Sequence, residues 1–144
     1  MAQTKKTVVA IGKFDGVHTG HKKLLKTASE LADKGGFVSV AFVISSDKSS
    51  GLMLPLDREK TIKNIGIDKV IVQDLTSDFM NMSDESFVKD IILKKLNCAH
   101  VVVGYNFRFA KGRSADAADL KELCAKEGIN CTIIPEVVCE TAGG

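Results

Sequence analysis

Short runs of apolar, mostly β-branched residues alternate with amphipathic helical patterns along the 144-residue sequence. Parallel strands need a crossover between them, and a helix usually supplies it. The alternation therefore predicts an α/β fold, with helices on both faces of a parallel sheet. The five expected strands are residues 7–11, 37–42, 69–73, 100–103 and 130–134. The expected helices are residues 20–34, the stretch between Pro55 and Gly66, residues 84–96 and residues 114–127, with Ser83 and Ser114 as N-caps of the last two.

The composition is that of an ordinary globular protein, with 44% hydrophobic and 26% charged residues. A chain of this length forms one domain, so we expect residues 1–144 to be a single unit. The net charge of +2 is too small to predict a nucleic-acid partner, and no apolar run approaches the ~18 residues that cross a membrane. The four cysteines have no metal-ligand spacing, and no signal sequence precedes the first strand. We therefore expect a cytoplasmic protein with reduced thiols and no nucleic-acid or membrane partner.

The segment between the first strand and the first helix, GKFDGVHTGH, is rich in glycine and histidine. Glycines recur at positions 12, 16 and 20, which a turn needs only where its backbone approaches a ligand closely. The following helix N-terminus favours anions. His18 and His21 beside it can donate to a polyphosphate and to the charge that builds up as it is cleaved. The pattern indicates nucleotidyl transfer.

Other interpretations of this segment fit less well. Asp15 is the only further metal ligand near the two histidines, so we expect no metal site held by the protein alone. The residues after Gly12 and Lys13 lack the spacing and the Ser or Thr of a P-loop. No G-x-G-x-x-G follows the first strand, which argues against a dinucleotide-dependent oxidoreductase.

A second unusual segment, VVVGYNFRFAKGRSAD, begins in the fourth expected strand. Phe107 and Phe109 alternate there with polar residues, and packing in the core under a loop is the simplest interpretation of both. Asn106 can pair with an adenine edge or a ribose hydroxyl, and Arg108 offers a planar fork for phosphate. The basic residues expected near phosphate are Lys13, Arg108, Lys111 and Arg113.

Parallel α/β sheets bind ligands beyond the carboxyl ends of their strands, where the strand order reverses. Residues 12–21, 43–53 and 104–114 each follow an expected strand and would open onto that edge. We therefore expect the two motifs to lie at the same edge of the sheet.

Taken together, the two segments resemble the FMN adenylyltransferase (FAD synthetase) domain of the bacterial bifunctional riboflavin kinase/FAD synthetase family. The family motif G-x-F-D-G-x-H-x-G-H is matched from Gly12 to His21. The motif V-V-G-x-[DN]-F-x-F-G-x-x-R is matched from Val102 to Arg113, apart from one glycine. The resemblance covers essentially the whole chain and implies a Rossmann-like nucleotidyltransferase fold. It implies that FMN phosphate is joined to the α-phosphate of ATP, releasing pyrophosphate with the assistance of Mg²⁺.

The resemblance also implies roles for the matched positions. His18 and His21 would contact the ATP phosphates and stabilise the transition state at the α-phosphorus. Gly104 and Asn106 would lie near adenine and ribose. The full set of expected nucleotide-binding residues is Gly12, Lys13, Phe14, Asp15, Gly20, Gly104, Asn106, Arg108 and Arg113.

The sequence departs from the family pattern in three places. Residues 42–46, FVISS, replace a Phe-x-Pro-His-Pro element. Ala110 replaces a glycine, a mild change unless the position requires a positive φ. The family's second catalytic motif, a Ser/Thr-rich run that ends in Ile-Arg, does not occur before Gly144, and neither does the riboflavin kinase domain.

We therefore expect a truncated form that folds and binds ATP weakly but makes little or no FAD, and a riboflavin kinase domain in the full-length chain. Two alternatives stay open. One is another small-molecule nucleotidyltransferase, such as a cytidylyltransferase or a relative of pantetheine-phosphate adenylyltransferase. The other is a non-catalytic nucleotide-binding module.

Overall fold

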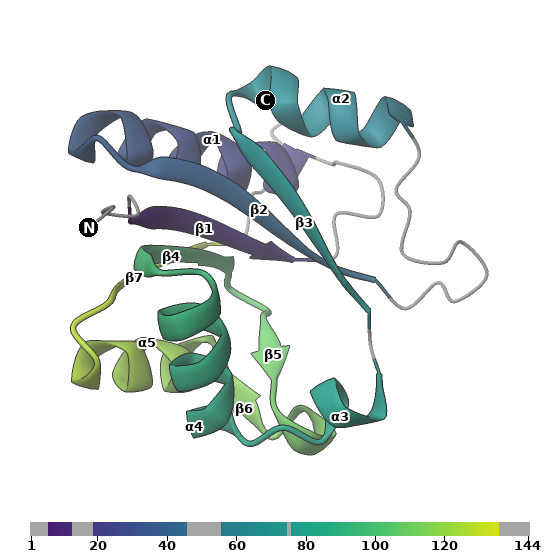
Figure 1. Cartoon of the computed structure of the whole chain (residues 1–144), viewed down its shortest axis with the longest axis vertical. Coiled ribbons are helices and arrows are strands. Elements are labelled where there is room, and N and C mark those ends of the chain that lie inside the picture. Colours follow the sequence, from purple (N-terminus) through teal and green to yellow (C-terminus); the bar gives the residue numbers. More distant parts are fainter. Residues whose placement is uncertain (1–5, 13–18, 46–55, 75, 136–144) are drawn as a thin grey trace, which may run out of the picture.

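Five parallel strands form the main sheet of the molecule (Figure 1). The computed structural model describes residues 6–12, 19–45, 56–74 and 76–135, with the backbone alone at residues 19–21, 45, 56–58 and 113. The strand order is β3-β2-β1-β4-β7, and every neighbouring pair is parallel. The strands are β1 (Thr7–Gly12), β2 (Val38–Ser45), β3 (Lys69–Asp74), β4 (Cys98–Gly104) and β7 (Asn130–Ile134). The predicted α/β fold and its five strands are confirmed.

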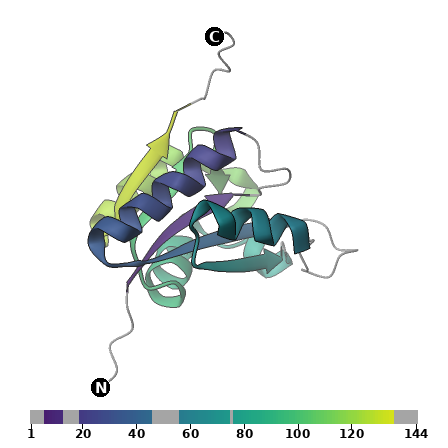
Figure 2. The ribbon, with the colours of Figure 1, turned by 90° about the horizontal axis from the view of Figure 1, so that it is seen from above.

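Helices cover both faces of this sheet (Figures 1 and 2). On one face lie α1 (Thr19–Gly35) and α2 (Leu56–Ile65), and on the other lie η2 (Phe87–Lys95) and α5 (Ala117–Lys126). The short helices α3 (Ser77–Met80) and α4 (Asp84–Ser86) precede η2. The helix η2 is a π-helix, which ends where the Leu96 N–H donates to the Ile91 carbonyl oxygen at 2.9 Å. Within the described ranges, no helix has the length and apolarity needed to cross a bilayer.

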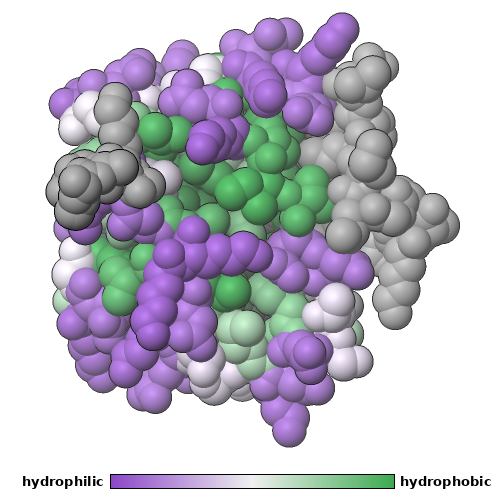
Figure 3. Space-filling view, in the orientation of Figure 1, coloured by the Kyte–Doolittle hydropathy of each residue, from purple (hydrophilic) through white to green (hydrophobic). Residues whose placement is uncertain are grey.

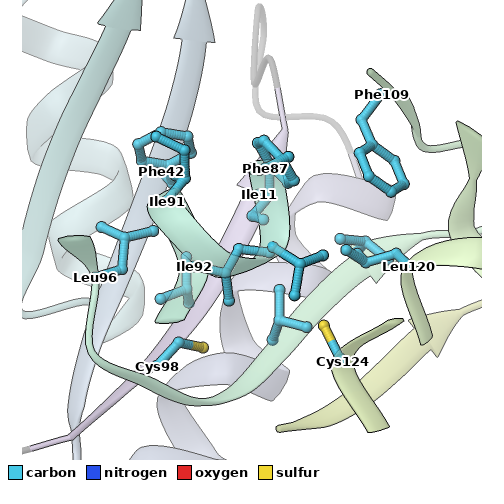
Figure 4. Close-up of a cluster of buried hydrophobic side chains, with 14 of the residues drawn as sticks. Ile11, Phe42, Phe87, Ile91, Ile92, Leu96, Cys98, Phe109, Leu120 and Cys124 are labelled. Atoms are coloured by element: carbon cyan, nitrogen blue, oxygen red, sulfur yellow. The ribbon is translucent and has the colours of Figure 1, made fainter. Parts of the chain in front are cut away.

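Successive side chains of each central strand enter two different apolar cores. Val8 and Ala10 of β1 pack with Leu25 of α1 and Ile62 of α2. The other core lies between the sheet and the helices η2 and α5 (Figure 4). Because both faces are buried, β1 is a continuous apolar run rather than an alternating one. The large side chains of the second core include Ile11, Phe42, Phe87, Ile92, Phe109 and Leu120.

The strand β3 is less well covered than the strands inside the sheet. It forms one edge of the sheet, and Val70, Ile71 and Val72 are only partly buried. In Figure 3, hydrophobic residues gather along the middle of the face on which β3 lies in front, between polar surfaces. The opposite edge is β7.

One predicted helix start is confirmed and one is wrong. Ser83 caps α4, since its Oγ accepts a hydrogen bond from the Ser86 N–H at 3.1 Å. Ser114 does not cap α5. The short elements η3 (Lys111–Arg113) and β6 (Ala115–Asp116) lie before that helix, and its N-cap is Asp116. Asp116 and Asp119 form a reciprocal capping box, which satisfies two backbone N–H groups at the helix start.

Candidate functional site

The carboxyl ends of β1 and β4 meet where the strand order reverses. The strands β1, β2 and β3 lie successively on one side, whereas β4 pairs with the other side of β1. The last registered pair between them is Ala10 with Val102, and Gly12 and Gly104 each follow two residues later as the last residues of their strands. Gly12 of the first sequence motif and Gly104 of the second therefore lie at one edge of the sheet, as predicted. Parallel α/β sheets bind ligands at this edge.

The first turn of α1 comes shortly after the end of β1 in the sequence. α1 starts at Thr19, seven residues after β1 ends, and its first turn includes Gly20 and His21. The free N–H groups and the dipole of the helix make this turn electropositive. The predicted residues Lys13, Phe14, Asp15 and His18 lie outside the described residues, as does most of the loop at 43–53. Their roles stay predictions, as does the role of the His21 side chain.

A tight turn follows β4 and brings Asn106 to the same edge. The Phe107 N–H donates to the Gly104 carbonyl oxygen at 3.1 Å, so Tyr105 and Asn106 occupy the middle of the turn. A Cβ atom at position 104 would lie 3.4 Å from Oδ1 of Asn106 and 3.8 Å from Cδ1 of Leu24 in α1. The exposed Asn106 amide thus lies beside the end of β4, within reach of a ligand at this edge.

Phe107 and Phe109 anchor the segment that follows this turn. Their rings stack on each other with centroids 5.6 Å apart, and the Phe109 ring lies 5.1 Å from that of Phe87 in η2. Phe87 also meets Phe79 of α3 edge-on at 5.9 Å. Phe109 is buried and Phe107 partly so. The prediction that both phenylalanines are core residues under a loop is confirmed.

Arg108 lies opposite an acidic residue. It belongs to β5 (Arg108–Phe109), which pairs antiparallel with β6 and places Arg108 across from Asp116. The pKa of Asp116 is lowered, chiefly because its carboxylate accepts the Asp119 N–H at 3.0 Å, and the positive charge of Arg108 adds to this effect. Arg108 is therefore electrostatically coupled to the start of α5. The expected contacts of Arg108 and Arg113 with phosphate stay predictions.

Ala110 adopts a backbone conformation that ordinarily requires glycine. Its φ is 74° and its ψ is 175°, a region that costs a side-chain-bearing residue about 1–3 kcal/mol. The next residue, Lys111, ties the segment to the rest of the fold, because its N–H donates to the Met82 carbonyl oxygen at 3.0 Å. The replacement of glycine by alanine at this position is therefore more than a mild change.

Cys98 and Cys124 are buried, and His100 is partly buried. Burial raises the pKa of Cys98 and of Cys124 to about 12, so both thiols stay protonated and pack as small apolar groups, as predicted. Burial also lowers the pKa of His100, whose Nε2 lies 2.7 Å from Oγ1 of Thr132. In the ranges that the structure describes, no group of three His, Cys, Asp or Glu residues could hold a metal ion. Cys139 lies outside those ranges.

Sequence reasoning passed over one exposed residue at this edge. Tyr105 directly follows Gly104 and is 51% exposed. The signal in the sequence is its place, because this aromatic residue directly follows the last glycine of an expected strand at the predicted ligand edge.

A parallel α/β domain whose strand order reverses between β1 and β4 is the class that this fold defines. The family model for FAD synthetase matches residues 1–143, and the chain belongs to that family. It is 31% identical over 143 residues to the FAD synthetase of Listeria monocytogenes, covering 93% of this chain and 58% of that protein. It is 30% identical to the bifunctional riboflavin kinase/FMN adenylyltransferase of Bacillus subtilis, covering 92% of this chain and 44% of that protein. The chain thus spans about half the length of these curated relatives.

A solved structure supports the fold. The crystal structure of a macrolide-efflux protein from Streptococcus pneumoniae matches with a TM-score of 0.80 at 24% identity, covering 97% of this chain and 48% of that chain. At this identity the likeness shows a shared fold.

Proposed function

We propose that this chain binds ATP and FMN and transfers the adenylyl group of ATP to the FMN phosphate, giving FAD and pyrophosphate. The observation that carries the proposal is the convergence of Gly12, Gly104 and Asn106 on the edge where the strand order reverses. Membership of the FAD synthetase family supports ATP and FMN as the proposed substrates.

The proposed reaction needs positioning and charge stabilisation more than covalent chemistry by the protein. An oxygen of the FMN phosphate attacks the α-phosphorus of ATP. The bond from that phosphorus to the bridging oxygen breaks, and pyrophosphate leaves with the electron pair. Negative charge grows on the leaving phosphates, and His18 and His21 are proposed to donate hydrogen bonds to them.

The glycines and the amide are proposed to hold the nucleotide in place. Gly12 and Gly20 lack a Cβ and let the phosphates approach the backbone, and the start of α1 offers N–H groups to an anion. Gly104 leaves room for the sugar or base beside β4, and the Asn106 amide can pair with an adenine edge or a ribose hydroxyl. Lys13, Phe14, Asp15, Arg108 and Arg113 complete the proposed nucleotide site.

Mg²⁺ is proposed to enter with ATP. It binds oxygen ligands, keeps several waters and is commonly held by substrate phosphates with one or two protein carboxylates. When bound, it neutralises phosphate charge. Its ligands would come chiefly from the nucleotide, because no three-ligand cluster lies among the residues that the structure describes.

We also propose that residues 1–144 form one domain and that a riboflavin kinase domain accompanies it in the full-length chain. The Bacillus subtilis relative is named as both a riboflavin kinase and an FMN adenylyltransferase. A cytoplasmic location is proposed as well, because Cys98, Cys124 and Cys131 are free thiols.

The test is a product assay with the purified chain at a concentration comparable to that of FMN, so that slow transfer is detected. We expect FAD and pyrophosphate in equal amounts from MgATP and FMN, separated by chromatography, and no FAD when riboflavin replaces FMN. Parallel reactions supply CTP with phosphocholine, and ATP with phosphopantetheine. A nucleotidyl product from either pair, with none from FMN, would contradict the proposal.

A further inference from the structure

Tyr105 is an aromatic residue that the fold leaves uncovered. Among the residues that the structure describes, it and Met80 are the only exposed large hydrophobic residues, with 51% and 46% of their surfaces accessible. The described phenylalanines are all buried or partly buried. An aromatic side chain is ordinarily worth most when its ring is covered. The exposed Tyr105 ring therefore does not contribute to the core.

The backbone holds Tyr105 at the ligand edge. It directly follows Gly104, the last residue of β4, and occupies the turn closed by the Phe107 N–H and the Gly104 carbonyl oxygen. Phe107 is fixed in turn by its stacking on Phe109 and by the Phe87 ring, whose centroid lies 6.5 Å away. A ring on such an anchored turn loses little backbone freedom when a ligand binds to it.

We propose that the Tyr105 ring stacks on the flat heteroaromatic ring of a nucleotide bound at this edge, and this inference rests on the proposed function. The two substrates each carry such a ring, adenine in ATP and isoalloxazine in FMN. Stacking uses the ring face and does not need the phenol hydroxyl. Tyr105 is then a binding residue, whereas the neighbouring Asn106 supplies the directional hydrogen bond.

Titration calorimetry on four proteins tests the inference. These are the parent chain, Tyr105→Ala, Tyr105→Phe and the control Met80→Ala, which removes the other exposed large hydrophobic side chain. Each is titrated with MgATP, with FMN and with tripolyphosphate, which has no ring. We expect Tyr105→Ala to weaken binding of the nucleotide whose ring stacks by about ten-fold, the scale of one lost base stack. Tyr105→Phe and Met80→Ala should bind like the parent, and tripolyphosphate should not distinguish the variants.

Tyrosine fluorescence gives a second measurement, because Tyr105 is the only tyrosine and the chain has no tryptophan. If adenine is the stacking ring, saturating MgATP should change the emission and tripolyphosphate should not. Parent-like binding of both MgATP and FMN to Tyr105→Ala would overturn the inference, and so would a parent chain that binds neither nucleotide. Nucleotide binding that depends on the ring, without FAD formation, would contradict the proposed function while leaving the stacking contact supported.

Discussion

In the interior of the sheet almost every side chain is apolar and buried, whereas the segment at residues 104–116 alternates buried rings with exposed polar groups. Val101, Val102 and Val103 at the end of β4 are fully buried. Immediately afterwards come the exposed residues Tyr105 and Asn106. The polypeptide therefore changes within three residues from a structure held by apolar burial to one that presents groups to solvent.

The two regions also differ in backbone strain. The five strands have regular parallel pairing, with one irregularity, between Thr7 and Val8. The segment at 104–116 contains Ala110 and Gly112, both with positive φ. Phe107 and Phe109 hold this segment in place through the aromatic cluster on η2. The contrast is typical of a stable scaffold that supports a strained loop.

The largest expected effect on stability comes from the interior. Ile92 of η2 is fully buried, and Ile92→Ala should lower the free energy of unfolding by about 2–5 kcal/mol, because it leaves a cavity. Denaturant unfolding followed by circular dichroism measures the loss. Lys89→Ala, an exposed position on the same helix, is the matched control and should change little. A comparable loss in both variants would mean that burial does not dominate the stability of this region.

The site should respond in activity rather than in stability. In a full-length version of the protein, His21→Ala should lower the rate of FAD synthesis about 10²-fold or more, the usual scale for loss of a preorganised donor to developing charge. The rate is measured at saturating MgATP and FMN, with unfolding followed in parallel. Glu30→Ala, at an exposed position further along α1, is the control and should keep the parent rate. A parent-like rate for His21→Ala would remove His21 from the mechanism.

Relief of strain should stabilise the segment at 104–116. Ala110→Gly should raise the free energy of unfolding by about 1 kcal/mol, because glycine adopts this φ and ψ without the cost that alanine bears. Replacing alanine by glycine ordinarily destabilises. The control Ala125→Gly in the helix α5 should therefore lower the free energy of unfolding. A loss of stability in both variants would show that Ala110 is not strained.

The smallest effect concerns His100. Burial lowers its pKa in the folded protein, so the unfolded chain takes up the proton first as the pH falls. The stability that His100 contributes is complete above its ordinary pKa of about 6.5 and is lost as the pH falls through the lower folded value. When the free energy of unfolding is measured from pH 7.5 downward, it should therefore fall less in His100→Gln than in the parent. Identical pH profiles would contradict this expectation.

The sheet could be predicted well because its signal is local. Strands buried on both faces need unbroken Val and Ile runs, and the predicted strand at 130–134 coincides with β7. The predicted convergence of Gly12 and Gly104 also holds, since it follows from the general topology of such sheets.

The segment after β4 was predicted only in part because its structure depends on distant contacts. Phe107 and Phe109 could be assigned to the core from their alternation. The pairing of Arg108 with Asp116 depends on the register of a short antiparallel pair, which no local pattern reveals. The α5 cap at Asp116 was missed for the same reason, because β6 displaces the helix start beyond Ser114. The positive φ of Ala110 runs against the preference of alanine itself.

The most direct test of the central claim, that the nucleotide binds between the carboxyl ends of β1 and β4, is a crystal structure of the chain with MgATP and FMN. We predict the ATP phosphates against the first turn of α1, with Asn106 beside the ribose or adenine. The FMN phosphate should point toward the α-phosphorus. Nucleotide bound elsewhere, with the edge at Gly12 and Gly104 empty, would contradict the account.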